Sequence, residues 1–207
     1  ASLLMGFFDP AAGRILLEGR DTRSFTPAQL REKRILVPQT VSLFSGTIRD
    51  NLLLAAPQAT DQELLEALEE VWLKDWVLAQ PLGLDTDVGD AGQKLSGGQR
   101  QKIGIARALL CQAEYILFDE ATSSVDLDSE REIWRCIDAL AKTRTLLIIS
   151  HRLSTIQGAD QIYVLDQGQV AQRGTHRQLM AEGGLYRRLV EEQQLLEHQG
   201  EEGLYHD

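Results

Sequence analysis

The string Leu95-Ser-Gly-Gly-Gln-Arg100 places two glycines at the start of a predicted helix. Ser96 and Gln99 form the S-x-x-Q pattern of a capping box, and apolar residues follow at helical spacing. Glycines let a ligand approach the backbone closely, and the free N–H groups and dipole of a helix start favour an anion. Phosphate is therefore the natural ligand. Taken alone, such a helix start is more often a purely structural cap.

Two apolar runs lead into residues that can do acid–base chemistry. Residues 115–118 precede Asp119 and Glu120, and residues 145–149 are followed closely by His151. Short continuous apolar runs are typical of strands buried on both faces of a parallel sheet. Because α/β folds bind ligands at the carboxyl ends of such strands, these three side chains are candidate site residues. Alone, the same patterns also fit a solvated acidic turn and a hydrogen-bonded loop histidine.

Five strings together resemble the ATP-hydrolysing domain of ABC transporters in their order and spacing. They are the Q-loop Val37-Pro-Gln39, the signature motif Leu95–Arg100, the Walker B strand Tyr115–Glu120, the D-loop Ser123-Ser-Val-Asp126 and the switch segment Ser150–Thr155. The resemblance extends from Ala1 to about Val190. Five motifs in the family's order make a chance match negligible.

The resemblance implies ATP hydrolysis with Mg²⁺ and gives each matching residue a role. Asp119 is expected to hold the magnesium ion through water, and Glu120 to polarise the attacking water. His151 is expected to contact the γ-phosphate region, and Gln39 to contact the magnesium ion or the attacking water. The other residues expected to bind the nucleotide are Ser96, Gly97, Gly98, Gln99 and Asp126.

Two further segments resemble the surface that exporters of this family turn toward the coupling helices of their membrane domain. They are Ser42–Asn51 and Asp87–Gly92, and they favour an exporter over an importer. The family usually carries Glu where this chain has Asp90, so the acidic contact is shortened. The implied partners are a transmembrane domain and a second ABC ATPase domain in a head-to-tail pair, at the cytoplasmic face of the plasma (inner) membrane.

The family's phosphate-binding loop, the Walker A motif, has no counterpart in the 207 residues. It needs G-x-x-x-x-G-K-[ST], and none of the five lysines follows a glycine. Residues 3–10 resemble the stretch that follows the Walker A lysine and serine in this family. We therefore expect a fragment that begins a few residues too late, lacks the N-terminal strands and the P-loop, and is inactive alone.

Strand and helix patterns alternate along the chain, which favours an α/β fold with a largely parallel sheet. Thr26-Pro27 signals a helix start, and Thr60–Glu63 starts a helix expected to reach about residue 80. A hairpin is expected at residues 161–173. With the resemblance, the expected parts are a P-loop NTPase-type core (1–39 and 115–190), an inserted, mainly helical signature subdomain (40–114) and a polar tail (191–207).

Composition argues against several other classes. A net charge of −10 without a cluster of Lys and Arg disfavours a nucleic-acid partner. No apolar run reaches the roughly eighteen residues that span a bilayer, and residues 1–5 lack the pattern of a signal peptide. Cys111 and Cys136 have neither CxxC spacing nor a histidine partner, so packed, reduced thiols are expected.

Two other functions share parts of this pattern. Chromosome-maintenance and repair ATPases carry similar signature and Walker B strings. A long coiled coil separates their Q-loop from the signature, whereas only residues 40–94 lie between those motifs here. The second alternative is a catalytically incomplete partner module that donates its signature motif to an intact ATPase subunit. The presence of Asp119, Glu120 and His151 favours the ATPase.

Overall fold

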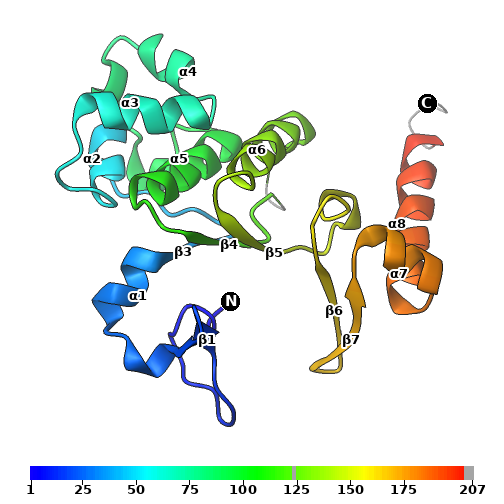
Figure 1. Ribbon diagram of the computed structural model, residues 1–207. Coiled ribbons are helices and arrows are strands. Elements are labelled where there is room, and N and C mark those ends of the chain that lie inside the picture. Colours follow the sequence, from blue (N-terminus) through cyan, green and yellow to red (C-terminus); the bar gives the residue numbers. More distant parts are fainter. Residues whose placement is uncertain (123–124, 203–207) are drawn as a thin grey trace. The chain divides into compact units, whose positions relative to one another are not determined.

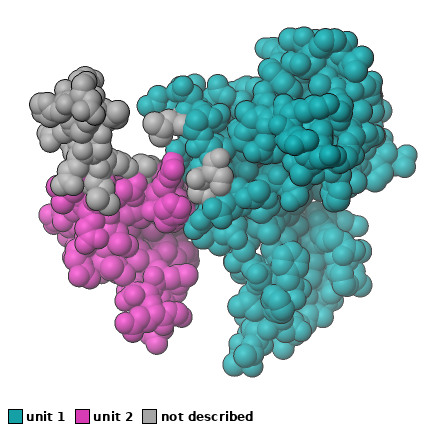
Figure 2. Space-filling view, turned by 180° about the vertical axis from the view of Figure 1, so that it is seen from behind, with its two compact units in different colours: residues 1–149 teal, residues 150–207 magenta. Residues whose placement is uncertain are grey.

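The computed structural model describes residues 1–122 and 125–202, so the D-loop residues Ser123 and Ser124 lie outside the described range. The chain divides into two compact units, Ala1–Ile149 (unit 1) and Ser150–Asp207 (unit 2), coloured separately in Figure 2. Each unit buries an apolar core of its own. The inserted signature subdomain expected at residues 40–114 stays a prediction.

Unit 1 is built on a parallel sheet of three strands in the order β3-β4-β5 (Figure 1). The strands are β3 (Arg34–Val37), β4 (Tyr115–Asp119) and β5 (Thr145–Ile149). Val37 lies opposite Phe118, and Asp119 lies opposite Ile149. The predicted α/β fold with a parallel sheet is confirmed, and the three strands end at a common edge.

Helices cover one face of this sheet (Figure 1). They are α2 (Ile48–Leu53), α3 (Asp61–Glu70), α4 (Lys74–Leu78), α5 (Gly97–Leu110) and α6 (Leu127–Leu140), with 3-10 turns at Gly83–Asp85 and Asp90–Gly92. Side chains alternate between the faces of β4. Ile116 and Phe118 join the core with α5 and α6 residues, while Tyr115 and Leu117 line a pocket formed with the N-terminal residues.

The N-terminal part of unit 1 contains a short antiparallel hairpin and a capped helix. The hairpin pairs β1 (Leu16–Leu17) with β2 (Arg20–Asp21). A 3-10 turn (Thr22–Ser24) leads to α1 (Pro27–Lys33). Thr26 accepts a hydrogen bond from the Gln29 N–H (3.2 Å), which confirms the predicted helix start.

The single helix predicted from residue 60 to about residue 80 is wrong, because the chain breaks it at Trp72. Trp72 takes a left-handed conformation with φ of 51°. The Leu73 N–H then donates to the Leu68 carbonyl (2.9 Å), the hydrogen bond that closes many helix C-termini. Glycine is the usual residue at such a turn, so a tryptophan there leaves no signal in the sequence.

Burial of β5 also differs from expectation. Leu147 is 43% exposed and Ile149 is 36% exposed, whereas Ile116 and Phe118 of the central strand are almost fully buried. Among the described strands β5 pairs only with β4, so its second edge is unpaired. The exposure of Leu147 and Ile149 shows that the burial on both faces predicted for residues 145–149 is wrong.

Unit 2 contains the predicted hairpin and a helical tail. Its elements are a 3-10 turn (Leu153–Thr155), β6 (Ile162–Asp166), β7 (Gln169–Gly174), α7 (His176–Glu182) and α8 (Leu185–Glu202). The strands are antiparallel, and Ile162, Leu179 and Tyr186 are central to the core. Within the described residues, no helix is long and apolar enough to cross a membrane.

Both cysteines are free thiols, as the sequence predicts. Cys136 is buried, and burial raises the pKa of its thiol to about 11. Burial also raises the pKa of Cys111. Both thiols are therefore protonated at neutral pH, which suits packing residues. The described part of the chain holds no group of three metal-ligating His, Cys, Asp or Glu side chains.

Candidate nucleotide site

The carboxyl edge of the sheet brings together three predicted site residues from two neighbouring strands. Asp119 is the last residue of β4 and Glu120 follows it. Gln39 comes two residues after Val37, which is paired with Phe118 on β4. Gln39, Asp119 and Glu120 therefore leave the same edge of unit 1. Two carboxylates and an amide oxygen are ligands that suit a hard cation such as Mg²⁺.

Glu120 sits in a backbone conformation that the sequence does not reveal. Its φ is 52°, in the left-handed region, and its N–H donates to the Ile149 carbonyl of β5 (2.9 Å). A left-handed residue other than glycine is strained by roughly 1–2 kcal/mol. Such strain clusters at functional sites, where the surrounding structure fixes a side chain in one place.

His151 follows β5 by two residues and is the second residue of unit 2. It is exposed. The turn around it is fixed by Ser150, whose hydroxyl accepts from the Arg152 N–H (3.0 Å) and lies 3.2 Å from the Thr155 hydroxyl. The expected contact of His151 with the γ-phosphate stays a prediction.

The start of α5 has the predicted capping box. The Gln99 N–H donates to Ser96 Oγ (3.1 Å), and the Ser96 N–H donates to Gln99 Oε1 (2.8 Å). Ser96 Oγ accepts in this box, so its hydroxyl hydrogen is free to point elsewhere. The helix has 14 residues, which gives its amino end a substantial dipole.

Gly98 packs against a neighbouring helix, whereas its place in the signature motif predicts that it lets a ligand approach. A methyl group on Gly98 would lie 2.4 Å from Ser129 Oγ on α6, so α6 itself fills the space beside this glycine. The Ser129 N–H also donates to Asp126, the cap of α6 (2.9 Å), and this hydrogen bond lowers the pKa of the Asp126 carboxyl. The roles of Gly97, Gly98 and Asp126 in nucleotide binding stay predictions.

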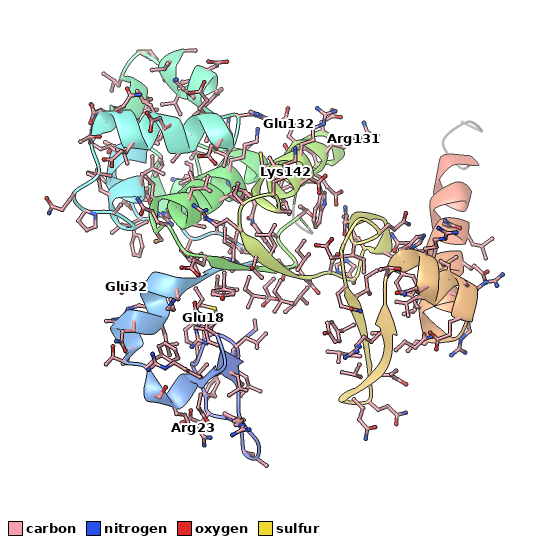
Figure 3. All side chains as sticks on the ribbon, viewed as in Figure 1. Glu18, Arg23, Glu32, Arg131, Glu132 and Lys142 are labelled. Carbon is pink, nitrogen blue, oxygen red and sulfur yellow. The ribbon has the colours of Figure 1, made fainter. Side chains whose placement is uncertain are left out.

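An ion pair between a buried lysine and an exposed glutamate also joins α5 to α6. The ammonium of Lys102 lies 2.6 Å from the carboxylate of Glu132, which is labelled on α6 in Figure 3. The Lys102 side chain is only 8% exposed. Together with Gly98, this pair fixes the signature helix against the helix that follows the D-loop.

A second feature missed from the sequence lies directly after the carboxylates. Thr122 is buried, and its hydroxyl donates to Glu130 of α6 (3.1 Å), which is also buried. This hydrogen bond ties the turn after Glu120 to α6. Thr122 and Glu130 are eight residues apart, which matches no short-range capping pattern. The sequence alone therefore gives no sign of this hydrogen bond.

The two segments that resemble an exporter's membrane-facing surface lie side by side. Thr47 pairs with Asp87, and the Ser45 hydroxyl donates to Asp90 Oδ1 (2.9 Å). We call Ser42–Asn51 and Asp87–Gly92 together the paired-loop surface. Phe44 on this surface is 65% exposed. The shorter Asp90 thus has a partner within the surface itself.

Comparison with known proteins places this arrangement in a family. The model of the ABC transporter family matches residues 1–123. A putative multidrug export ATP-binding/permease protein of Staphylococcus aureus (strain NCTC 8325 / PS 47) is 44% identical over 194 residues, covering 94% of this chain and 34% of that protein. A protein of similar name from Staphylococcus aureus (strain bovine RF122 / ET3-1) is 43% identical, and the match again covers 94% of this chain and 34% of that protein.

A solved structure has a similar fold. It is a bacterial Atm1-family ABC exporter with ATP bound, which matches with a TM-score of 0.86 and 41% identity. The match covers 93% of this chain and 34% of that chain. The chain therefore spans about a third of the length of the relatives it resembles.

Proposed function

The chain belongs to the ABC transporter family, and we propose that it forms part of the ATP-hydrolysing domain that powers an exporter. The observation that carries the proposal is that Gln39, Asp119 and Glu120 all lie at or just after strand ends on the carboxyl edge of the parallel sheet. That edge is where α/β folds bind ligands, and the residues found there match the expected chemistry.

Asp119 and Glu120 divide the work of hydrolysis in this proposal. Bound Mg²⁺ supplies charge that neutralises the phosphate oxygens during transfer. Asp119 would hold that ion, and the Gln39 side chain would help to position it. Glu120 accepts a hydrogen bond from the attacking water and orients it. His151 is the residue proposed to contact the γ-phosphate region.

The signature motif serves a different nucleotide, held by a second ABC ATPase domain in a head-to-tail pair. Ser96 already accepts the Gln99 N–H, so its hydroxyl is free to donate to the partner's γ-phosphate. The amino end of α5 adds favourable dipole charge for the same group. ATP thus closes the pair, and hydrolysis lets it open.

The paired-loop surface docks on the transmembrane domain of the exporter in this proposal. Exposed Phe44 supplies an apolar anchor, and the link from Ser45 to Asp90 joins the two loops. In this proposal the domain lies at the cytoplasmic face of the plasma (inner) membrane. The opening and closing of the ATPase pair then moves the membrane domain.

The 207-residue chain by itself is proposed to bind ATP weakly and not to turn it over. No G-x-x-x-x-G-K-[ST] sequence occurs in it, and in P-loop proteins that loop supplies most contacts to the phosphates. The second candidate function is a partner module that only donates its signature motif to an intact ATPase subunit. Hydrolysis that depends on Glu120 separates the two.

The test is ATP turnover by the full-length protein in lipid, with Glu120→Gln as the variant. The substitution keeps the shape of the side chain but removes its charge, so we expect ATP to bind and turnover to fall by about a hundredfold or more. Glu114→Gln, just before the opposite end of β4, is the matched control and should leave turnover unchanged. Near-normal turnover in Glu120→Gln would refute the role proposed for Glu120.

A further inference from the structure

Three residues of α5, spaced three apart, contact the chain segment that leaves β3. Gln101, Gly104 and Arg107 lie on one face of the helix because residues three apart are neighbours on its surface. We call them the α5 stripe. Each contacts a different part of the segment from Pro38 to Asn51, which begins with the Q-loop and ends in the paired-loop surface.

Gln101 contacts the Q-loop itself. Its side chain is buried, at 3% exposure, and its Nε2 donates to the Pro38 carbonyl (3.1 Å). That carbonyl belongs to the planar peptide group that joins Pro38 to Gln39. The hydrogen bond therefore fixes the orientation of the peptide from which the Gln39 side chain projects.

Gly104 lets the same segment approach the helix backbone. A methyl group at Gly104 would lie 2.4 Å from Cγ2 of Val41, which is buried at 6% exposure. Glycine inside a helix is less favourable than alanine by about 1 kcal/mol. The close packing of Val41 gives this helix a reason to carry glycine here.

Arg107 forms hydrogen bonds with Ser42 and with Asn51 at the end of the segment. Its guanidinium donates to the carbonyls of Ser42 (2.9 Å) and Asn51 (2.7 Å) and to Asn51 Oδ1 (2.6 Å). Asn51 is 1% exposed and in turn bonds both the N–H and the carbonyl of Phe44 (2.9 Å each). The exposed Phe44 is thus connected to α5 through partly buried hydrogen bonds.

We propose that the α5 stripe is a positioning device that holds Gln39 at the magnesium site and ties it to the paired-loop surface. The inference rests on the proposed function of Gln39. The signature motif opens the same helix, so a displacement of the paired-loop surface is shared by α5 and the Q-loop. Gln101 and Arg107 are positioning residues that touch neither nucleotide nor metal.

The test measures ATP turnover by the full-length protein in lipid as a function of Mg²⁺ concentration. Gln101→Leu replaces the amide with an apolar side chain of similar size and removes the hydrogen bond to Pro38. We expect the Mg²⁺ concentration for half-maximal turnover to rise about three- to tenfold, the effect of losing one hydrogen bond. Gln80→Leu is the matched control, because Gln80 also donates to a backbone carbonyl, that of Trp76 (3.0 Å).

Coupling to Gln39 separates positioning from a loss of stability. Gln39→Ala should raise the Mg²⁺ requirement by itself, and adding Gln101→Leu to it should have no further effect, because the two act through one contact. If Gln39→Ala leaves the Mg²⁺ requirement unchanged, the function proposed for Gln39 is wrong and the inference falls with it. If Gln39→Ala raises it but Gln101→Leu behaves like Gln80→Leu, the inference alone is overturned.

A second pair of variants does not depend on Gln101. Gly104→Ala should also raise the Mg²⁺ requirement, because the new methyl group displaces Val41 and the Q-loop beside it. Val41→Ala in the same chain removes the clashing methyl groups and should restore a requirement near that of the wild type. An unchanged requirement in Gly104→Ala, or no recovery in the double variant, would contradict the proposal.

Discussion

Glu120 combines a strained backbone with the side chain proposed to orient water. Its φ of 52° is one that glycine adopts without strain and alanine does not. We therefore expect Glu120→Gly to be more stable than Glu120→Ala by about 1 kcal/mol, the reverse of the order at an ordinary helix position. Thermal unfolding of the two full-length variants measures the difference. Equal or reversed stabilities would show that the strain is absent in solution.

Thr122 provides a second prediction at the residue scale. Thr122→Val keeps the shape of the side chain and removes the buried hydrogen bond to Glu130. We expect a loss of about 1–3 kcal/mol in unfolding free energy, because an acceptor that is buried loses a donor. Thr122→Ser, which retains the hydroxyl, should lose less. If the valine variant is as stable as the serine variant, this hydrogen bond does not stabilise the turn.

At the scale of elements, capping carboxylates make helix stability depend on pH. Glu63 accepts the Thr60 N–H (2.7 Å) at the start of α3, and this hydrogen bond holds the pKa of the carboxyl below its ordinary value of 4.5. A lowered pKa means that the stabilisation is present above the ordinary value and is lost as the pH falls through the folded value.

Glu63→Gln tests this dependence because glutamine also serves in capping boxes but does not titrate. Hydrogen exchange of the α3 amides should show the wild type better protected near neutral pH. The difference should shrink as the pH falls below the ordinary value of 4.5 and the carboxylate is protonated. A difference that stays constant over this range would mean that the Glu63 charge does not stabilise α3.

The apolar edge of β5 predicts how the 207-residue chain behaves alone. Unpaired strand edges recruit other chains, and Leu147 on β5 is 43% exposed. We expect self-association, visible in light scattering after size exclusion, and less of it in Leu147→Lys. Leu189→Lys, at an exposed leucine of α8, is the control and should change little. A monodisperse wild-type chain with cooperative unfolding would contradict this.

At the scale of the whole chain, sequence patterns predict the parts that depend on local rules. The capping boxes at Thr60 and Ser96, the parallel strands and the hairpin near residue 165 follow from residue types at short spacing, and the structure confirms them. The break at Trp72 does not follow, because a non-glycine residue adopts a glycine-like conformation there. Tertiary packing, rather than local preference, decides such a position.

Sequence patterns likewise predict some parts of the candidate site and miss others. Motif order indicates Gln39, Asp119 and Glu120, and strand pairing places them at one edge. The supports behind them come from residues far apart in sequence, such as the hydrogen bond from Gln101 to Pro38. A pattern confined to neighbouring residues cannot show contacts of this kind. The nucleotide roles of the signature residues stay predictions.

Mixing two inactive variants of the full-length protein tests the composite site most directly. In a head-to-tail pair, Ser96→Arg blocks the nucleotide held by the partner, whereas Glu120→Gln disables the nucleotide held by its own chain. A mixed pair of these variants keeps one site intact. A pair of wild type with the double variant Ser96→Arg/Glu120→Gln has a defect in both sites.

We predict that mixing the two single variants restores ATP turnover well above that of either one alone. Wild type held in covalent pairs with the double variant should stay nearly inactive, because removing one such contact in a dry site costs about 2–4 kcal/mol of transition-state stabilisation. No recovery in the mixed single variants, or equal turnover in the two kinds of pair, would contradict a nucleotide shared between Glu120 of one chain and Ser96 of the other.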